Sequence, residues 1–186
     1  MISFLTAFDY KLNLRYTIYA VRDGDEMESL QYQGWNFEFD KAATREYYAS
    51  HHDECTCASC RNFHKNVNEM PLEVKSFLEG FGIDVDNPIE QMSVIALKDE
   101  NLVEQQVEYC VKGTTASKDG YEIDIGPVQI VLLKKEHMAN HEMEEPYFGL
   151  ALFNMYFHWT VGDDINECYP EQQSLLQKIK AFLFRR

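Results

Sequence analysis

Three cysteines fall within six residues of this chain, at Cys55, Cys57 and Cys60. Thiolates are preferred ligands of zinc, with Zn–S distances of about 2.3 Å, and a structural zinc ion takes four such donors. A bound ion would tie this stretch into one tight loop. His64 lies four residues after Cys60, so the two side chains share a face of any helix that starts near Cys60. We therefore predict a structural zinc site made by these three cysteines and His64.

The fourth ligand has alternatives. His51 and His52 stand shortly before the cluster, and Cys110 is a remote candidate. Along one straight helix Cys57 and His64 would lie about 10 Å apart, which is too far for one metal ion. The prediction therefore requires Cys57 to lie in the loop before the helix.

Two other interpretations of the cysteine cluster involve no metal. Cys57 and Cys60 have the C-x2-C spacing of a thiol redox pair, although such pairs usually lie near a βαβ pattern, and the pattern here is antiparallel. The cysteines can also be reduced thiols without a special role. Five cysteines cannot all pair, and disulfides are rare in the reducing cytoplasm, so a disulfide framework is not expected.

Alternating apolar residues predict strands. One alternation runs through residues 12–22 and a second through 30–39, with Gly34 placed as a bulge between two phases. We expect Trp35 and Phe37 to be core residues in an antiparallel ribbon with residues 12–22. Further strands are expected near 92–98, 103–112, 121–125, 128–135 and 147–160, the last one central because both its faces are apolar.

Helical patterns are fewer. Pro71 suits the first turn of a helix that Gly82 ends, with Leu72, Phe77, Leu78 and Phe81 on its apolar stripe. A second amphipathic helix begins at Pro170. Strands and helices do not alternate regularly, so we predict an α+β fold with a mainly antiparallel sheet, sandwich-like or curled. A short helical insertion follows the cysteine cluster, and residues 1–186 are expected to form a single domain.

Charge and hydropathy limit the partners. The net charge of −14 repels nucleic acid and anionic lipid, and it would suit a basic protein partner. No apolar stretch reaches the roughly 20 residues that cross a bilayer, and the N-terminal residues lack the features of a secretory signal. These observations predict a cytoplasmic protein without a nucleic-acid or membrane partner.

Catalytic motifs do not stand out. His137 and His141 have the spacing of a zinc-protease pair, but Met138 stands where that motif needs glutamate. The sequence also lacks the nucleophile elbow and the phosphate-binding glycine loops. We therefore predict a protein that is not an enzyme.

The stretch from Cys55 to Phe63, C-T-C-A-S-C-R-N-F, and the stretch from Pro71 to Asp84, P-L-E-V-K-S-F-L-E-G-F-G-I-D, resemble a group of small uncharacterised proteins of Gram-positive bacteria. The resemblance spans residues 55–84, about a sixth of the chain. It implies a bacterial protein in which the cluster and the following helix form one unit, and it carries no activity.

The leading interpretation is an acidic, non-enzymatic domain with a structural zinc site. One alternative is a thiol redox protein that uses Cys57 and Cys60. Another is an acidic interaction module, such as an inhibitor or immunity-type partner of a basic protein.

Overall fold

The computed structural model describes residues 4–9, 14–20, 26–51 and 55–169. Its strands are β1 (Phe4–Asp9), β2 (Leu14–Ala20), β3 (Glu26–Tyr32), β4 (Trp35–Asp40), β5 (Glu90–Leu97), β6 (Leu102–Thr115), β7 (Glu122–Ile125), β8 (Val128–Leu133) and β9 (Tyr147–His158). In these residues nine strands form one sheet, in the order β1-β2-β3-β4-β6-β9-β8-β7, with β5 also paired to β6. Every pair is antiparallel. The predicted α+β fold with a curled antiparallel sheet is confirmed.

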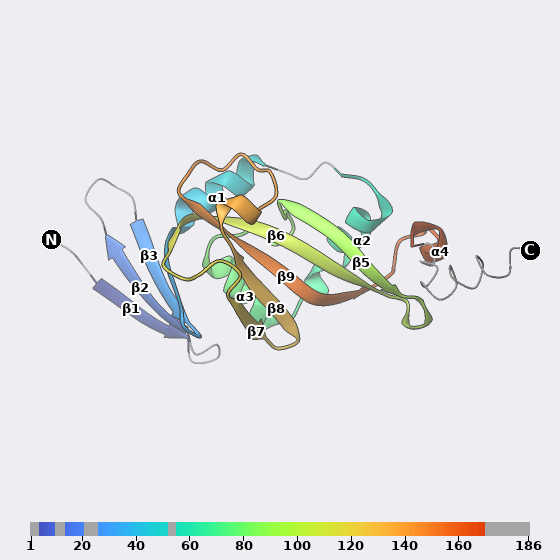
Figure 1. Ribbon diagram of the computed structural model, residues 1–186, viewed down its shortest axis with the longest axis horizontal. Helices are drawn as coiled ribbons and strands as arrows, with labels where there is room; N and C mark the ends of the chain where they lie inside the picture. Colours follow the sequence, from blue (N-terminus) through green and yellow to red (C-terminus); the bar gives the residue numbers. More distant parts are fainter. Residues whose placement is uncertain (1–3, 10–13, 21–25, 52–54, 170–186) are drawn as a thin grey trace, which may run out of the picture.

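The long strand β6 organises the sheet (Figure 1). One edge of β6 pairs with β9 from Leu102 to Lys112, with a register shift between Gln105 and Val107. The other edge pairs first with β5 and then, from Gly113 to Thr115, with β4. Beyond β4, the strands β1, β2 and β3 extend to one end of the molecule. Strand β9 is buried without a break from Phe148 to Leu152, which confirms its predicted central place.

The predicted pairing of β4 was wrong. Tyr32 pairs directly with Trp35, so β3 and β4 form a hairpin, and β3 separates β4 from β2. Gln33 and Gly34 between them have φ values of 46° and 88°, as a two-residue hairpin turn of the primed type requires, so Gly34 is a turn residue and not a bulge. The predicted core role of Trp35 and Phe37 is confirmed, since they are 0% and 1% exposed.

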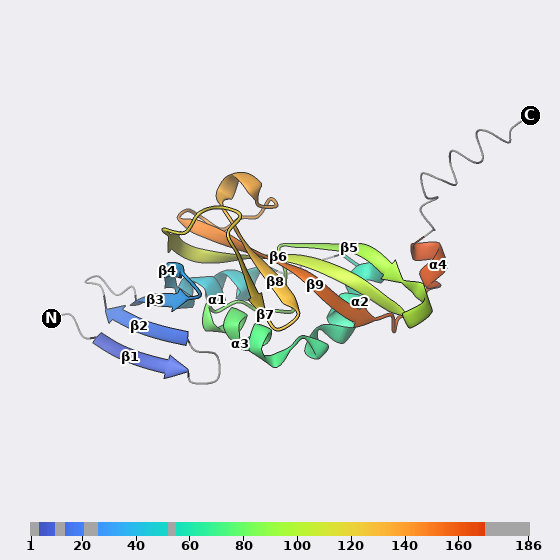
Figure 2. The same cartoon turned by 60° about the horizontal axis from the view of Figure 1, so that its bottom comes forward.

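The helices are α1 (Lys41–Ser50), α2 (Ala58–Asn66), α3 (Leu72–Gly80) and the short α4 (Ile165–Cys168), with 3₁₀ turns η1 (Val67–Glu69), η2 (Lys98–Glu100) and η3 (Lys135–His137). Figure 2 shows α1, α2 and α3 along one face of the sheet. Their apolar residues join those of the strands in one core. These helices therefore close the core on that face, and they place the cysteine cluster at the start of α2.

Two features of the helices differ from expectation. Helix α1 was not predicted, although Asp40 accepts a hydrogen bond from the Ala43 amide at 2.8 Å and so caps its first turn. In α3, Phe77 and Leu78 are buried as expected, but Leu72 is 70% exposed and does not belong to the stripe. At about 100° per residue, Leu72 lies roughly 140° and 240° around the helix axis from Phe77 and Leu78, so its side chain points away from the core.

None of the helices in the described part of the chain combines the length and the apolar character needed to cross a bilayer. The predicted helix from Pro170 onward lies outside the described residues.

Candidate metal centre

The sulfur atoms of Cys55, Cys57 and Cys60 all lie within 4.8 Å of one another. The Sγ atoms of Cys57 and Cys60 are 3.5 Å apart, and neither thiol is in a disulfide. In a tetrahedral site with Zn–S bonds of about 2.3 Å, the sulfur atoms would lie about 3.8 Å from one another. The three thiols are therefore close enough to hold one metal ion.

Cys57 is the N-cap of α2, in the loop before the helix as the zinc hypothesis requires. The Cys60 amide donates to Cys57 Sγ at 3.5 Å, and this bond lowers the pKa of the Cys57 thiol. Burial instead raises the pKa of Cys60 well above its ordinary value. Without metal, the exposed Cys57 thus loses its proton first, while Cys60 stays protonated.

A polar network fixes the first turn of α2 against the sheet. Ser59, which lies between the two last cysteines, hydrogen-bonds through its hydroxyl to that of Ser93 in β5. The Gln91 amide donates to Ser59 Oγ at 3.1 Å and to Gln105 Oε1 at 2.9 Å. Gln105 is fully buried in β6. Hydrogen bonds to β5 therefore fix the turn that carries Cys57 and Cys60.

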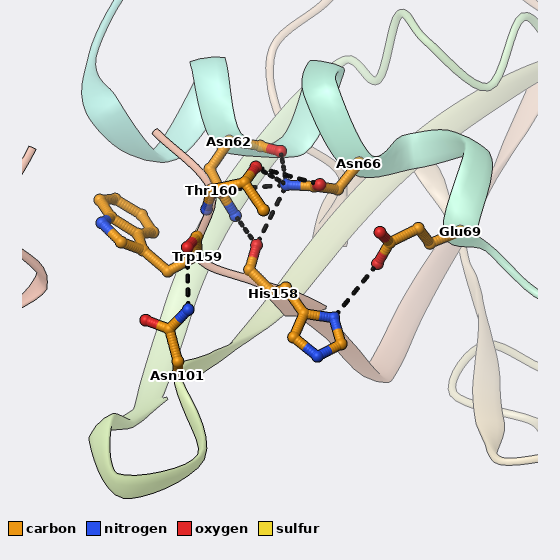
Figure 3. Close-up of polar contacts among 7 residues, drawn as sticks. All are labelled: Asn62, Asn66, Glu69, Asn101, His158, Trp159 and Thr160. Carbon is orange, nitrogen blue, oxygen red and sulfur yellow. Dashed lines mark hydrogen bonds and ion pairs between the residues drawn. The ribbon is translucent and has the colours of Figure 1, made fainter. Parts of the chain in front are cut away.

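The rest of α2 is anchored to the end of β9 (Figure 3). The Asn62 amide donates to the His158 carbonyl at 3.0 Å, and Asn62 Oδ1 accepts from the Thr160 amide at 2.8 Å. Asn66 donates to the same carbonyl at 3.1 Å and to Thr160 Oγ1 at 2.9 Å. Both asparagines are buried, so these bonds satisfy groups that water does not reach. Helix α2, which contains Cys60 and is capped by Cys57, is thus hydrogen-bonded to the end of β9.

The predicted fourth ligands lie in different surroundings. His64 Nδ1 is 3.7 Å from Asp86 Oδ1, and in the described part of the chain no histidine or carboxylate joins the group of three cysteines. Cys110 is buried beside the Tyr48 hydroxyl, 3.9 Å away, and burial raises its pKa to about 11. His52 lies outside the described residues. Which of the proposed residues completes the site stays a prediction.

His51 shares a cleft of about 350 Å³ with Cys55 and Cys60. The other walls come from the C-terminal end of α1, from the start of β5 and the residues before it, and from the loop that precedes β9. These residues are Tyr47, Tyr48, Asn87, Pro88, Ile89, Glu90, Gln91, Asn140, His141 and Glu142. Sequence reasoning did not connect these groups with the cysteines, because up to about 90 residues separate them and no local pattern links them.

His51 is held firmly on the cleft wall. Its Nδ1 is 2.9 Å from the Tyr47 carbonyl oxygen, and its ring stacks on the Tyr47 ring with centroids 4.2 Å apart and planes inclined by 15°. Its Nε2 lies 3.0 Å from Glu142 Oε2. The ring thus bridges α1 and the loop before β9.

His141 lines the same cleft, but its hydrogen bonding differs from that of His51. Its Nδ1 accepts from the Met143 amide at 3.2 Å, and burial lowers its pKa. Its neighbour in the sequence pattern, His137, points instead to Asp119, with Nδ1 and Oδ2 2.5 Å apart. The two histidines with zinc-protease spacing therefore do not converge on one point.

Comparisons of the chain with protein-family models, with curated proteins and with solved structures find no match. The functional argument accordingly depends on the geometry of the cysteine cluster and of the cleft beside it.

Proposed function

We propose that the protein binds one zinc ion through Cys55, Cys57 and Cys60, and that the ion has a structural role. The observation that carries the proposal is the convergence of three sulfur atoms within 4.8 Å at the start of α2. Soft thiolates select zinc over the hard cations magnesium and calcium. A divalent ion would also offset the repulsion among thiolates that lie this close, and it would keep Cys60 deprotonated despite its burial.

The structural role follows from the anchoring of α2. Ser59 and Asn62 attach the helix to the sheet from below, but Cys55 and Cys57 lie exposed on the outer side. An ion bound by the three thiols would tie the loop of Cys55 and Cys57 to helix α2. Metal binding would then add directly to the free energy of folding.

Elemental analysis of protein purified under reducing conditions, without chelator or a nickel affinity step, tests the proposal. We expect about one zinc per chain, and loss of the metal in Cys57→Ser. Cys168→Ser is the matched control, because Cys168 is an exposed cysteine outside the cluster. A parent protein that contains no metal when freshly purified would refute the proposal.

A second function is favoured by the unequal thiols. Cys57 is exposed with a lowered pKa, and buried Cys60 lies 3.5 Å away, which is the division of labour of a dithiol reductant. The Cys57 thiolate would attack a substrate disulfide and release one substrate thiolate. Cys60 would then attack the mixed disulfide, so that a Cys57–Cys60 disulfide forms and the second substrate thiol leaves.

Alkylation with iodoacetamide separates the two functions. If zinc is bound, native Cys57 reacts slowly and chelation raises its rate markedly, while Cys60, which is buried and has a raised pKa, stays slow in both states. Rapid reaction at mildly acidic pH that a chelator leaves unchanged would contradict the zinc site and support the dithiol. Reaction of Cys57 only after unfolding, with or without chelator, would contradict both functions.

A further inference from the structure

We propose that His51 is the fourth ligand of the metal, and that metal binding and Glu142 compete for its Nε2 atom. This inference depends on the proposed metal site. It also predicts a change in the cleft. An ion bound by the three cysteines and His51 releases the Glu142 carboxylate, and one contact between the end of α1 and the loop before β9 is lost.

The first argument is the orientation of the ring. A histidine that binds a metal usually donates its other ring N–H to a carbonyl or carboxylate, which fixes the tautomer and the ring plane. His51 has this arrangement already, since Nδ1 lies 2.9 Å from the Tyr47 carbonyl oxygen and the ring stacks on Tyr47. Ser50 Oγ is 3.0 Å from the same Nδ1, and it can accept the Nδ1 proton while its own hydroxyl donates to the Tyr47 carbonyl. Nε2 is therefore the nitrogen left for a ligand in the cleft that Cys55 and Cys60 also line.

The other nearby donors are less suited. His141 uses the lone pair of Nδ1 to accept from the Met143 amide, so a neutral ring carries its proton on Nε2 and offers no free nitrogen to the cleft. Cys110 is fully buried and is enclosed by Tyr48. His64 lies beside Asp86 and does not line the cleft. Of these candidates, His51 alone combines a place in the cleft with a ring that stays an ordinary neutral imidazole, protonated at Nδ1, when Nε2 gives up its proton to bind a metal.

The second argument concerns Glu142. Its carboxylate oxygen lies 3.0 Å from Nε2, a contact that places a proton on Nε2 and makes the ring an imidazolium when Nδ1 also donates. A metal must displace that proton, because a nitrogen that binds a metal uses its lone pair for the metal. Nε2 therefore cannot serve both partners. His51 also lies outside the present group of three cysteines, so it has to move toward them when the metal binds, and this movement separates it from Glu142. The Glu142 side chain is 83% exposed, so water can solvate the freed carboxylate at little cost.

Competition titrations of the whole reduced chain with zinc, and titrations with cobalt(II) followed by visible absorption, test both parts. We expect His51→Ala to weaken zinc binding by at least about 10- to 100-fold, the loss typical even of an outer-shell partner, and to shift the cobalt absorption bands. His141→Ala removes another imidazole of the same cleft and should leave both unchanged.

The competing carboxylate gives an effect of opposite sign. Glu142→Ala should tighten zinc binding by about two- to fivefold, because an exposed ion pair contributes little. Glu144→Ala, which removes an exposed carboxylate from the same loop, should have no effect. A variant that merely misfolds would weaken binding, so a gain in Glu142→Ala cannot arise from damage.

The outcomes are distinguishable. If the parent and His51→Ala bind zinc equally well with the same cobalt spectrum, His51 is not a ligand, while the proposed site of three cysteines stands. If Glu142→Ala binds like the parent, the competition is refuted. If the parent itself binds no metal, the proposed function fails first.

Discussion

Removing the Asn62 side chain should loosen the attachment of α2 to the end of β9. The residue is 0% exposed, and its amide takes part in three hydrogen bonds: to the His158 carbonyl at 3.0 Å, from the Thr160 amide at 2.8 Å and from Asn66 Nδ2 at 3.1 Å. Each bond contributes about 0.5–1.5 kcal/mol net. The His158 carbonyl keeps a bond from Asn66, so one group, the Thr160 amide, loses its partner.

From these contributions we expect Asn62→Ala to lower the free energy of unfolding by about 2–4 kcal/mol. That is a large part of the 5–15 kcal/mol typical of a domain. Urea unfolding in excess chelator measures the loss without a contribution from bound metal. Asn68→Ala is the control, because Asn68 is exposed just after α2 and makes one 3.3 Å bond to Lys75; it should change stability by less than about 0.5 kcal/mol.

A local measurement complements the global one. Loosening of α2 should expose Cys60, so its alkylation in chelated protein should become faster in Asn62→Ala and not in Asn68→Ala. Equal unfolding midpoints for the two variants would refute the view that the asparagine cluster anchors the helix.

Two further results are expected. Phe37→Ala should lower the free energy of unfolding by about 3–5 kcal/mol, because the ring is 1% exposed and packs against two other phenylalanine rings with centroids 5.0 and 5.1 Å away. Asn36→Ala, on the opposite face of the same strand, should change it by less than about 0.5 kcal/mol. Equal melting temperatures of the two variants would contradict the core assignment. In chelated protein, the alkylation of Cys57 should begin at lower pH than that of Cys168. The pKa of Cys57 is lowered, whereas slight desolvation and nearby acids raise the pKa of the exposed Cys168. Mass spectrometry of the labelled peptides measures the order, and the reverse order would show that the helix-capping bond does not activate Cys57.

The sequence by itself determined the local features of this protein. Alternation places the later strands within a few residues of their observed limits, because side chains on a strand point alternately to the two faces of a sheet. The spacing of the cysteines likewise puts Cys57 and Cys60 within one turn of each other, wherever the segment lies in the fold. A metal ion shared by Cys57 and His64 would also require Cys57 to precede the helix, and the structure places Cys57 at the N-cap.

Only the tertiary structure decided how these pieces meet. The same alternation in β4 fits pairing with β2 or with β3, and the turn at Gln33 and Gly34 chooses between them through backbone angles that hydropathy does not encode. The cleft depends even more on the tertiary structure, since His51 and Glu142, which meet there, are 91 residues apart in the sequence. Contacts over such separations depend on the order in which strands join the sheet, and pattern within a short window carries no information on that order.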